Sequence, residues 1–321
     1  MAHTRADPGG PVIHRTLAES DLDRVLALLP AGEVGVWADA DVFRERLATG
    51  EYRPEWTWVA EEAGEPHAVA VWWGSPGDER PGALDTLNAT ASPARTDVVA
   101  GLLDAAHAAF GGTPPEFHIL LPANWRERPD AVAGLDWRRE AAGRAGLTTA
   151  VERLRYEWSR ADGVPAPPRR LRLRPEADDE VFVALFRRVL DGTLDAASRT
   201  AAAAVGAEAQ ARADVAFYRD VMAGERTWWR VAEDFDGRPA GFALPSRNSG
   251  SHVVGYLGVL PEQRGHGYVD DLLAETTRIL AEEAGADVVR ADTDLTNHPM
   301  AAAFERLGYR DFARRMVLSA G

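Results

Sequence analysis

The stretch Val259-Leu-Pro-Glu-Gln-Arg264-Gly265-His266-Gly267-Tyr268-Val269 lies between an apolar run and a helical pattern. It predicts a strand, a tight glycine-containing turn and the start of a helix. Glycine lets a backbone approach a ligand closely, and the free N–H groups at a helix N-terminus point toward an anion under the favourable end of the helix dipole. Because Arg-Gly-x-Gly occurs in many turns, its meaning depends on a second segment about thirty residues later.

That second segment reads Asp292-Thr-Asp294-Leu-Thr-Asn297-His-Pro-Met-Ala301-Ala-Ala-Phe304-Glu-Arg-Leu307-Gly308-Tyr309. Its apolar positions recur at helical spacing between Pro299 and Gly308. Proline in the first turn and glycine just past the end are typical of a helix.

In their residues, order and spacing, the two segments together resemble the GNAT acyltransferase superfamily. In that family, a Val-x-Pro-x-x-Arg-Gly-x-Gly turn grips the pyrophosphate of acetyl-CoA, and the helix after the Asn flanks the pantetheine arm. The resemblance therefore implies acetyl-CoA as co-substrate, bound by Leu257, Gly258, Val259, Arg264, Gly265, His266, Gly267, Tyr268, Val269 and Asn297. Val269 departs from the family's usual Gly or Ala, and its side chain would either narrow the anion site or turn into the core.

Composition limits the other possibilities. The chain has 321 residues, 45% of them apolar, which is enough for two ordinary cores. The polar, Pro/Gly-rich N-terminus predicts no signal peptide, and no apolar run reaches the roughly 20 residues needed to span a bilayer. We therefore expect a cytoplasmic protein with no membrane partner. The absence of cysteine excludes disulfides, thiolate metal sites and a cysteine acyl-enzyme.

The charge is strongly acidic. All 36 basic residues are Arg, and the formal net charge is −14. This disfavours nucleic acid as a partner and mildly favours a cationic amine through steering, although an acidic solubilising surface is the simpler interpretation. A homodimer is a possible assembly. The eight His form no metal-binding spacing, so no metal is expected.

The chain repeats itself. Residues 50–66 and 224–239 both read Gly-Glu, a Trp pair, Val-Ala-Glu and then Gly-x-Pro, at an offset of about 173 residues. A Pro-rich spacer, residues 161–168, separates the copies. The repeat predicts a domain at residues 1–160 and a second at residues 169–321.

Each copy predicts the same order of strands and helices, of the α/β class. The strands are expected at residues 12–15, 56–61 and 68–73, and at 171–174, 228–233 and 240–244; the helices at 22–29 and 42–47, and at 181–190 and 215–221. A strand, a helix, a strand, a helix and a final strand follow in each copy. The resemblance implies two tandem GNAT folds, each with a mixed, mostly antiparallel sheet flanked by helices.

The two copies differ at the anion-binding turn. Where the second has Arg264-Gly-His-Gly, the first has Asn88-Ala-Thr-Ala-Ser-Pro-Ala-Arg-Thr96, with no glycine and with Pro93 removing one donor. We expect the first copy to be a degenerate domain without a CoA loop, and a site for another ligand is the alternative.

The family often uses a Tyr on the last helix to protonate the leaving thiolate, but Phe304 occupies that position here. Tyr256 and Tyr309 are the nearby phenols, and Tyr256 is preferred as the acid. Asp292, at the end of a predicted strand, and His252 are the candidate bases. Asp294 and Trp228 are candidates for binding the acceptor; a cap of the next helix is the other interpretation of Asp294, and core packing that of Trp228.

No Gly-x-Ser-x-Gly nucleophile is present. The resemblance therefore implies an N-acetyltransferase that acts on a small-molecule amine in its C-terminal domain, and the lack of a nucleophile candidate predicts direct transfer. Two alternatives remain: a protein or peptide amine as acceptor, and a non-catalytic CoA-binding protein.

Overall fold

The computed structural model describes residues 11–321, which form two compact units. The first contains the described residues up to Glu152 together with Ala313–Gly321, and the second is Arg153–Phe312. Residues 1–10, on which the expectation of no signal peptide rests, lie outside the described part.

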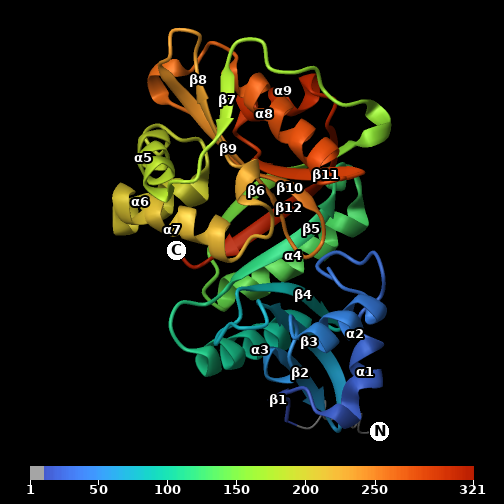
Figure 1. The fold of residues 1–321 in the computed structure, drawn as a ribbon. Helices are drawn as coiled ribbons and strands as arrows, with labels where there is room; N and C mark the ends of the chain where they lie inside the picture. The colour runs from blue at the N-terminus through green and yellow to red at the C-terminus, as the bar shows by residue number, and fades with distance from the viewer. Residues whose placement is uncertain (1–10) are drawn as a thin grey trace, which may run out of the picture. The chain divides into compact units, whose positions relative to one another are not determined.

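The first unit begins with the short strand β1 and two helices, continues with three consecutive strands, and ends with alternating helices and strands (Figure 1). Its elements are β1 (Ile13–Thr16), α1 (Leu22–Leu26), α2 (Ala40–Thr49), β2 (Thr57–Glu62), β3 (Glu65–Trp73), β4 (Ala83–Ala89), α3 (Arg95–Phe110), β5 (Glu116–Pro122), α4 (Pro129–Arg144) and most of β12 (Arg310–Ser319). The sheet order is β1-β2-β3-β4-β5-β12. The β4/β5 pair is parallel, and the other recorded pairs are antiparallel.

The second unit has the same plan. Its elements are most of β6 (Thr149–Ser159), β7 (Arg172–Pro175), α5 (Asp179–Val189), α6 (Ala196–Val205), α7 (Ala207–Asp220), β8 (Arg230–Glu233), β9 (Pro239–Arg247), β10 (His252–Val259), α8 (Tyr268–Arg278), β11 (Val288–Asp294) and α9 (His298–Arg306). The sheet order is β7-β8-β9-β10-β11-β6, and β10/β11 is its parallel pair. The two units therefore share one strand order with one parallel pair in the same place, which is the mixed, mostly antiparallel α/β sheet expected from the sequence.

The boundary between the two structural units does not coincide with the linker predicted from the sequence, because two strands belong mostly to the unit formed by the other repeat. Strand β6 precedes the predicted linker, yet its residues Arg153–Ser159 pair with β11 of the second unit. Strand β12 ends the second repeat, yet its residues Ala313–Leu318 pair with β5 of the first unit. The last strand of each repeat thus completes the sheet of the other, a relationship that sequence similarity cannot reveal.

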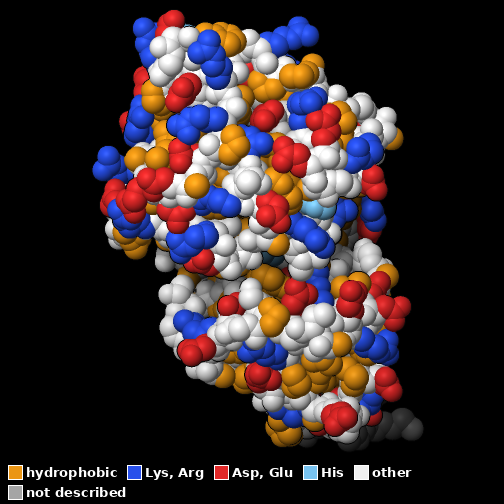
Figure 2. All heavy atoms as spheres, viewed as in Figure 1, with side chains coloured by type: hydrophobic (Ala, Val, Ile, Leu, Met, Phe, Trp, Pro, Cys, Tyr) orange, Lys and Arg blue, Asp and Glu red, His pale blue; other side chains and the backbone are white. Residues whose placement is uncertain are grey.

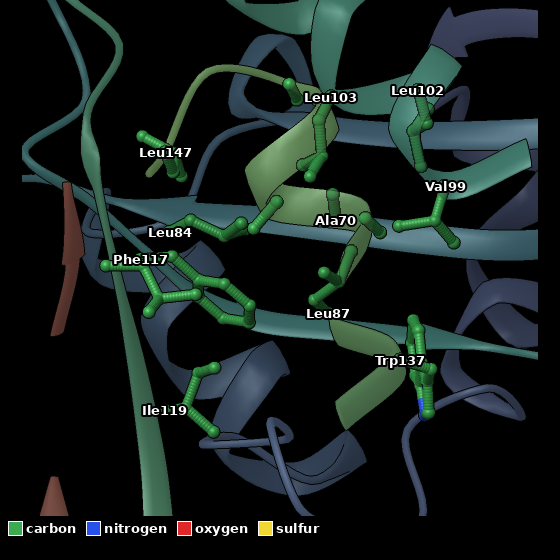
Figure 3. Close-up of a cluster of buried hydrophobic side chains, with 14 of the residues drawn as sticks. Ala70, Leu84, Leu87, Val99, Leu102, Leu103, Phe117, Ile119, Trp137 and Leu147 are labelled. Atoms are coloured by element: carbon green, nitrogen blue, oxygen red, sulfur yellow. The ribbon is translucent and has the colours of Figure 1, made fainter. Parts of the chain in front are cut away.

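Each sheet is covered by helices on both faces. In the first unit, Phe43 packs with valines of β2 and β3 on one face, while Leu84, Val99 and Phe117 belong to the core on the other (Figure 3). In the second unit, α5 and α7 cover one face through Phe182 and its neighbours, and α8 and α9 cover the other.

Most predicted elements are present with shifted ends, but α6 was not predicted. Residues 196–205 consist largely of alanine and lack apolar periodicity, so only the cap of this helix has a sequence signal: the carboxylate of Asp195 accepts from the Ser198 N–H at 2.8 Å.

Acidic and basic side chains are interspersed over the face shown in Figure 2. No helix in the described part of the chain is both long and apolar enough to cross a membrane. The described residues also contain no group of three or more metal-ligating side chains.

Candidate active site

The two parallel strands of the second unit separate soon after they meet. Strands β10 and β11 pair only at His252↔Val289 and Val253↔Arg290. Beyond this point, β10 continues beside β9 and β11 continues beside β6 as far as Asp294. The backbone groups of β10 that face β11 along residues 257–259 therefore have no strand partner, and they can pair with amides of an extended ligand.

A bulge accompanies the separation. The register between β9 and β10 shifts between Val253 and Tyr256. Gly255 has φ of 70°, and a Cβ on it would lie 2.0 Å from the carbonyl oxygen of Leu244. Only glycine fits this position, and the bulge sets which face of the sheet Tyr256 enters.

The turn after β10 has the geometry of an anion site. Gly265 has φ of 83°, and Gly267, the residue before α8, has φ of 73°. Within the described residues, no acceptor is recorded for the backbone N–H groups of residues 265–269. Five consecutive donors at a helix N-terminus fit the pyrophosphate of a CoA.

Four predicted residues of this turn have side-chain contacts in the structure. Val269 packs against the core between α8 and α9, so its side chain turns inward. Arg264 donates to three carbonyl oxygens, those of Val259 (3.2 Å), Gly192 (3.1 Å) and Val189 (3.0 Å), and so ties the turn to the end of α5. Its guanidinium is therefore engaged with the backbone. His266 is exposed and lies beside Tyr268, with 5.6 Å between ring centroids.

The second motif starts α9 as expected. Asn297 is the N-cap, and its side chain accepts from the Met300 N–H at 3.4 Å. Phe304 is buried between Tyr156 and Tyr309, whose ring centroids lie 4.9 Å and 5.2 Å away. The Tyr309 hydroxyl lies 2.6 Å from the Thr277 hydroxyl inside the core, so this phenol is engaged there.

Tyr256 lies among aromatic rings beneath α5 and α7. Its centroid is 4.6 Å from that of Phe186 and 6.4 Å from that of Tyr218. Burial, together with the charges of Asp195 and Asp214, raises the pKa of the Tyr256 phenol above its ordinary range. The hydroxyl therefore stays protonated at neutral pH, which a general acid requires.

The charges that act on this phenol belong to a polar cluster, and most of its members were not predicted. It consists of Arg153, Asp195, Asp214 and Tyr218, to which the predicted Asp294 also belongs. Tyr218 lies one turn after Asp214 on α7. Asp214 accepts from Gln210 at 2.8 Å through Oδ1, while its buried Oδ2 has no hydrogen-bond partner among the described residues. Burial, partly offset by Gln210 and reinforced by the charge of Asp195, raises the pKa of Asp214 to about 6.

Among the residues that the structure describes, Arg153 supplies the cation of the ion pairs in this cluster. Its Nη2 lies 2.9 Å from Asp195 Oδ2, and its Nε lies 3.3 Å from Asp294 Oδ1. Asp294 also accepts from the Ala196 N–H at 2.6 Å, which stabilises the start of α6 rather than of α9. With Asp214 included, the cluster has three carboxylates for one guanidinium, an imbalance that favours a cationic ligand.

The remaining predicted site residues, Asp292, His252 and Trp228, differ in burial and in their contacts. The strand β11 extends through Asp292 and Asp294, beyond its predicted end, and Asp292 pairs with Arg155 at 3.2 Å. His252 is half-buried at the start of β10, where burial and the charge of Arg247 lower its pKa. Trp228 is 8% exposed and packs within the core, so this indole does not line an open face.

A cavity of about 380 Å³ lies in the first unit. It is lined by Asp136, Arg139, Glu140, Gly143, Leu147, Thr148, Ala150 and Leu318. Because none of the candidate residues lines it, the site is identified by the diverging strands and the turn, not by this cavity.

Comparison with known proteins points to the same segment. Residues 196–309 match the family described as the acetyltransferase (GNAT) family. None of the curated protein sequences compared with the chain matches it.

Solved structures resemble nearly the whole chain. A tandem GNAT protein from the clavulanic acid biosynthesis pathway is 19% identical, with TM-score 0.51, over 97% of this chain and 99% of that one. A GCN5-related N-acetyltransferase from Sphaerobacter thermophilus is 14% identical, with TM-score 0.57, over 96% and 94% of the two chains. At these identities the likeness shows the fold alone.

Proposed function

We propose that this chain, whose residues 196–309 match the GNAT acetyltransferase family, transfers an acetyl group from acetyl-CoA to a small-molecule amine in its second unit. Acetyl-CoA is the co-substrate of the family. The observation that carries the proposal is the combination of five backbone donors at the start of α8 with the diverging strands β10 and β11.

The turn and the strands divide the binding of the donor between them. The N–H groups of residues 265–269 hold the pyrophosphate, and the free edge of β10 at Leu257 pairs with the pantetheine amides, whereas the backbone groups of Gly258 face β9. The Val259 N–H is the expected donor to the thioester carbonyl oxygen, where negative charge develops as the amine attacks. Asn297 and α9 form the other side of the pantetheine path.

The polar cluster supports an amine as acceptor. Its excess of carboxylate attracts an ammonium group, and a carboxylate with a pKa of about 6, such as Asp214, can accept a proton near neutral pH. Tyr256 is the expected acid for the leaving thiolate. His252 and Asp292 remain alternative bases: the lowered pKa of His252 keeps its imidazole neutral, whereas Asp292 is paired with Arg155.

The chemistry proceeds by direct transfer. The amine nitrogen attacks the thioester carbon, the C–S bond breaks, the thiolate takes a proton, and the nitrogen loses one. We assign no CoA site to the first unit. In the first unit, helix α3 begins after Pro93 and Ala94, and the turn before it contains no glycine. We therefore give the first unit a structural role in the tandem chain.

One observation favours a second candidate, a CoA-binding protein without catalysis. Phe304 occupies the position of the usual tyrosine and is buried among other rings. A protein or peptide amine remains an alternative acceptor for the enzyme.

The test is calorimetry with acetyl-CoA, followed by thiol release against a panel of small amines and peptides. The chain has no Cys, so a thiol reagent reports only released CoA. One-site binding with amine-dependent release supports the proposal, and the best acceptor separates small molecules from peptides. Binding without release from any acceptor supports the non-catalytic alternative, and no binding overturns both.

A further inference from the structure

The segment that enters β7 is fastened to the start of α8. Asp271, in the first turn of α8, is 5% exposed. Its Oδ2 accepts three backbone N–H bonds, from Arg169 (2.9 Å), Arg170 (2.6 Å) and Leu171 (3.1 Å). One buried carboxylate therefore holds three consecutive residues against the helix that carries the anion-binding turn.

The side chain of Arg170 returns to that turn. Its Nη1 donates to the His266 carbonyl oxygen at 3.2 Å, and a Cβ on Gly267 would lie 2.3 Å from the same nitrogen. The guanidinium thus lies directly against the loop. Gly267 is required here both for its positive φ and for the space that Arg170 fills.

The first turn of α8 carries two carboxylates close to the expected pyrophosphate. Arg170 contacts both: its Nε is 3.3 Å from Asp271 Oδ1, and its Nη2 is 3.6 Å from Asp270 Oδ2. Arg306, on α9, lies 2.7 Å from Asp270 Oδ1. Two cations therefore balance two anions, and the helix N-terminus remains attractive to a further anion.

The side chain of Arg264, which precedes Gly265 in the same turn, is engaged by other carbonyl oxygens. Arg264 donates to three carbonyl oxygens at the end of α5 and in β10. The side chain of Arg169, the neighbour of Arg170, is exposed and makes no recorded hydrogen bond or ion pair in the described part of the chain. Arg170 is therefore distinguished from both by its contact with the loop.

We propose that Arg170 is a positioning residue of the acyl-CoA site: it orients the loop through His266 and cancels the charge of Asp270 and Asp271, which would otherwise repel the pyrophosphate. The inference rests on the proposed function, because it assumes that residues 265–269 bind the phosphates of an acyl-CoA. It adds that the first residues of the second repeat, just after the Pro-rich spacer, control the affinity for the donor.

The test compares acetyl-CoA binding by calorimetry in the wild type, Arg170→Gln, Arg170→Lys and the matched control Arg169→Gln. Arg170→Gln should raise Kd about 10-fold or more, since losing one compensating charge leaves a net carboxylate beside the ligand. Arg170→Lys should recover most of the affinity, and Arg169→Gln should change Kd less than about 2-fold. Thermal melting checks that each variant is folded.

A double substitution separates charge compensation from mere support of the fold. Asp270→Asn alone should tighten acetyl-CoA binding, and in the Arg170→Gln background it should restore affinity to within about 3-fold of the wild type. S-acetylpantetheine, which lacks the phosphates, should serve as donor equally well in the wild type and in Arg170→Gln.

The outcomes distinguish the inference from the function on which it rests. If the wild type binds acetyl-CoA but Arg170→Gln binds equally well, or Asp270→Asn does not restore affinity, the inference is overturned while the acyl-CoA site stands. If the wild type does not bind acetyl-CoA, the proposed function fails first and the inference fails with it.

Discussion

Arg153 on β6 and Asp294 on β11 lie directly opposite each other, with 3.3 Å between Nε and Oδ1. Two further cross-strand pairs continue along the same face: Arg155 with Asp292 at 3.2 Å, and Glu157 with Arg290 at 3.1 Å. Because β6 precedes the linker, the first repeat supplies both a strand and a cation to the unit that carries the candidate site.

Of these three cross-strand ion pairs, Arg153–Asp294 should contribute most to the free energy of unfolding. Arg153→Met leaves Asp294, which is 3% exposed, without its guanidinium, and should lower the free energy of unfolding by about 3 kcal/mol or more. Arg290→Met, in the more exposed third pair, is the matched control and should cost less than about 1 kcal/mol. Urea denaturation measures both, and equal losses would contradict the ranking.

The exchanged strands predict that the repeats do not fold separately. A fragment of residues 161–321 lacks β6, the partner of β11 along Val288–Asp294, and leaves that strand edge unpaired. We expect it to be insoluble or unfolded by circular dichroism when expressed alone, and soluble when co-expressed with residues 1–160. A well-folded monomeric fragment would contradict this.

Substitutions at Gly267 and at Ala94, the residues before the two equivalent helices, should differ sharply in their effect on acetyl-CoA binding. Gly267→Glu forces a side chain into a backbone with φ of 73° that already contacts Arg170, and adds negative charge beside the pyrophosphate. It should weaken acetyl-CoA binding at least about 100-fold. Ala94→Glu, at the matching helix start of the first unit, should leave Kd unchanged. Loss of binding in both variants would show that the first unit also contributes to the site.

Tyr256→Phe tests the acid. Removing the hydroxyl while keeping the ring should lower kcat about 100-fold or more and leave KM for acetyl-CoA nearly unchanged. Tyr309→Phe is the control, because that hydroxyl bonds Thr277 in the core and should affect only stability. Equal kcat values for wild type and Tyr256→Phe would remove Tyr256 from the mechanism.

Asp214 should shape the pH dependence. Its pKa is raised to about 6, so the activity that depends on its carboxylate should fall as the pH drops below about 6. Asp214→Asn should lose most activity and also this acidic limb. Its effect on acceptor KM should exceed its effect on acetyl-CoA KM.

The same shift has a consequence for stability. The carboxyl of Asp214 has a pKa of about 6 in the folded protein, against an ordinary value of 3.8. Its protonated form therefore stabilises the fold below pH 3.8, relative to the ionised form above pH 6. This contribution is lost as the pH rises between these two values. Asp214→Asn should therefore flatten the pH dependence of unfolding between about pH 4 and 6. A variant with an unchanged pH profile would show that Asp214 titrates normally.

The part of the fold predicted from sequence is the part encoded by neighbouring residues. The Gly265-His-Gly267 turn precedes α8, Asn297 caps α9, and the repeated Trp-containing segments form matching strands. Each depends on backbone conformation or periodicity within one short segment. In contrast, α6 was not predicted because its alanines carry no apolar period. The sequence also did not reveal that Asp294 accepts from the Ala196 N–H, because that N–H lies far away in the chain.

The tandem α/β plan, the Gly265–Gly267 turn and the absence of cysteine chemistry could be predicted from the sequence alone, because composition, glycine placement and repeat spacing are local properties of the chain. The tertiary structure was needed to show which strand completes which sheet, that Arg264 is engaged by carbonyl oxygens while Arg170 contacts the loop, and that the charge of Asp214 acts on the Tyr256 phenol. These relationships depend on sheet register and helix packing between distant segments, and no spacing along the sequence records them.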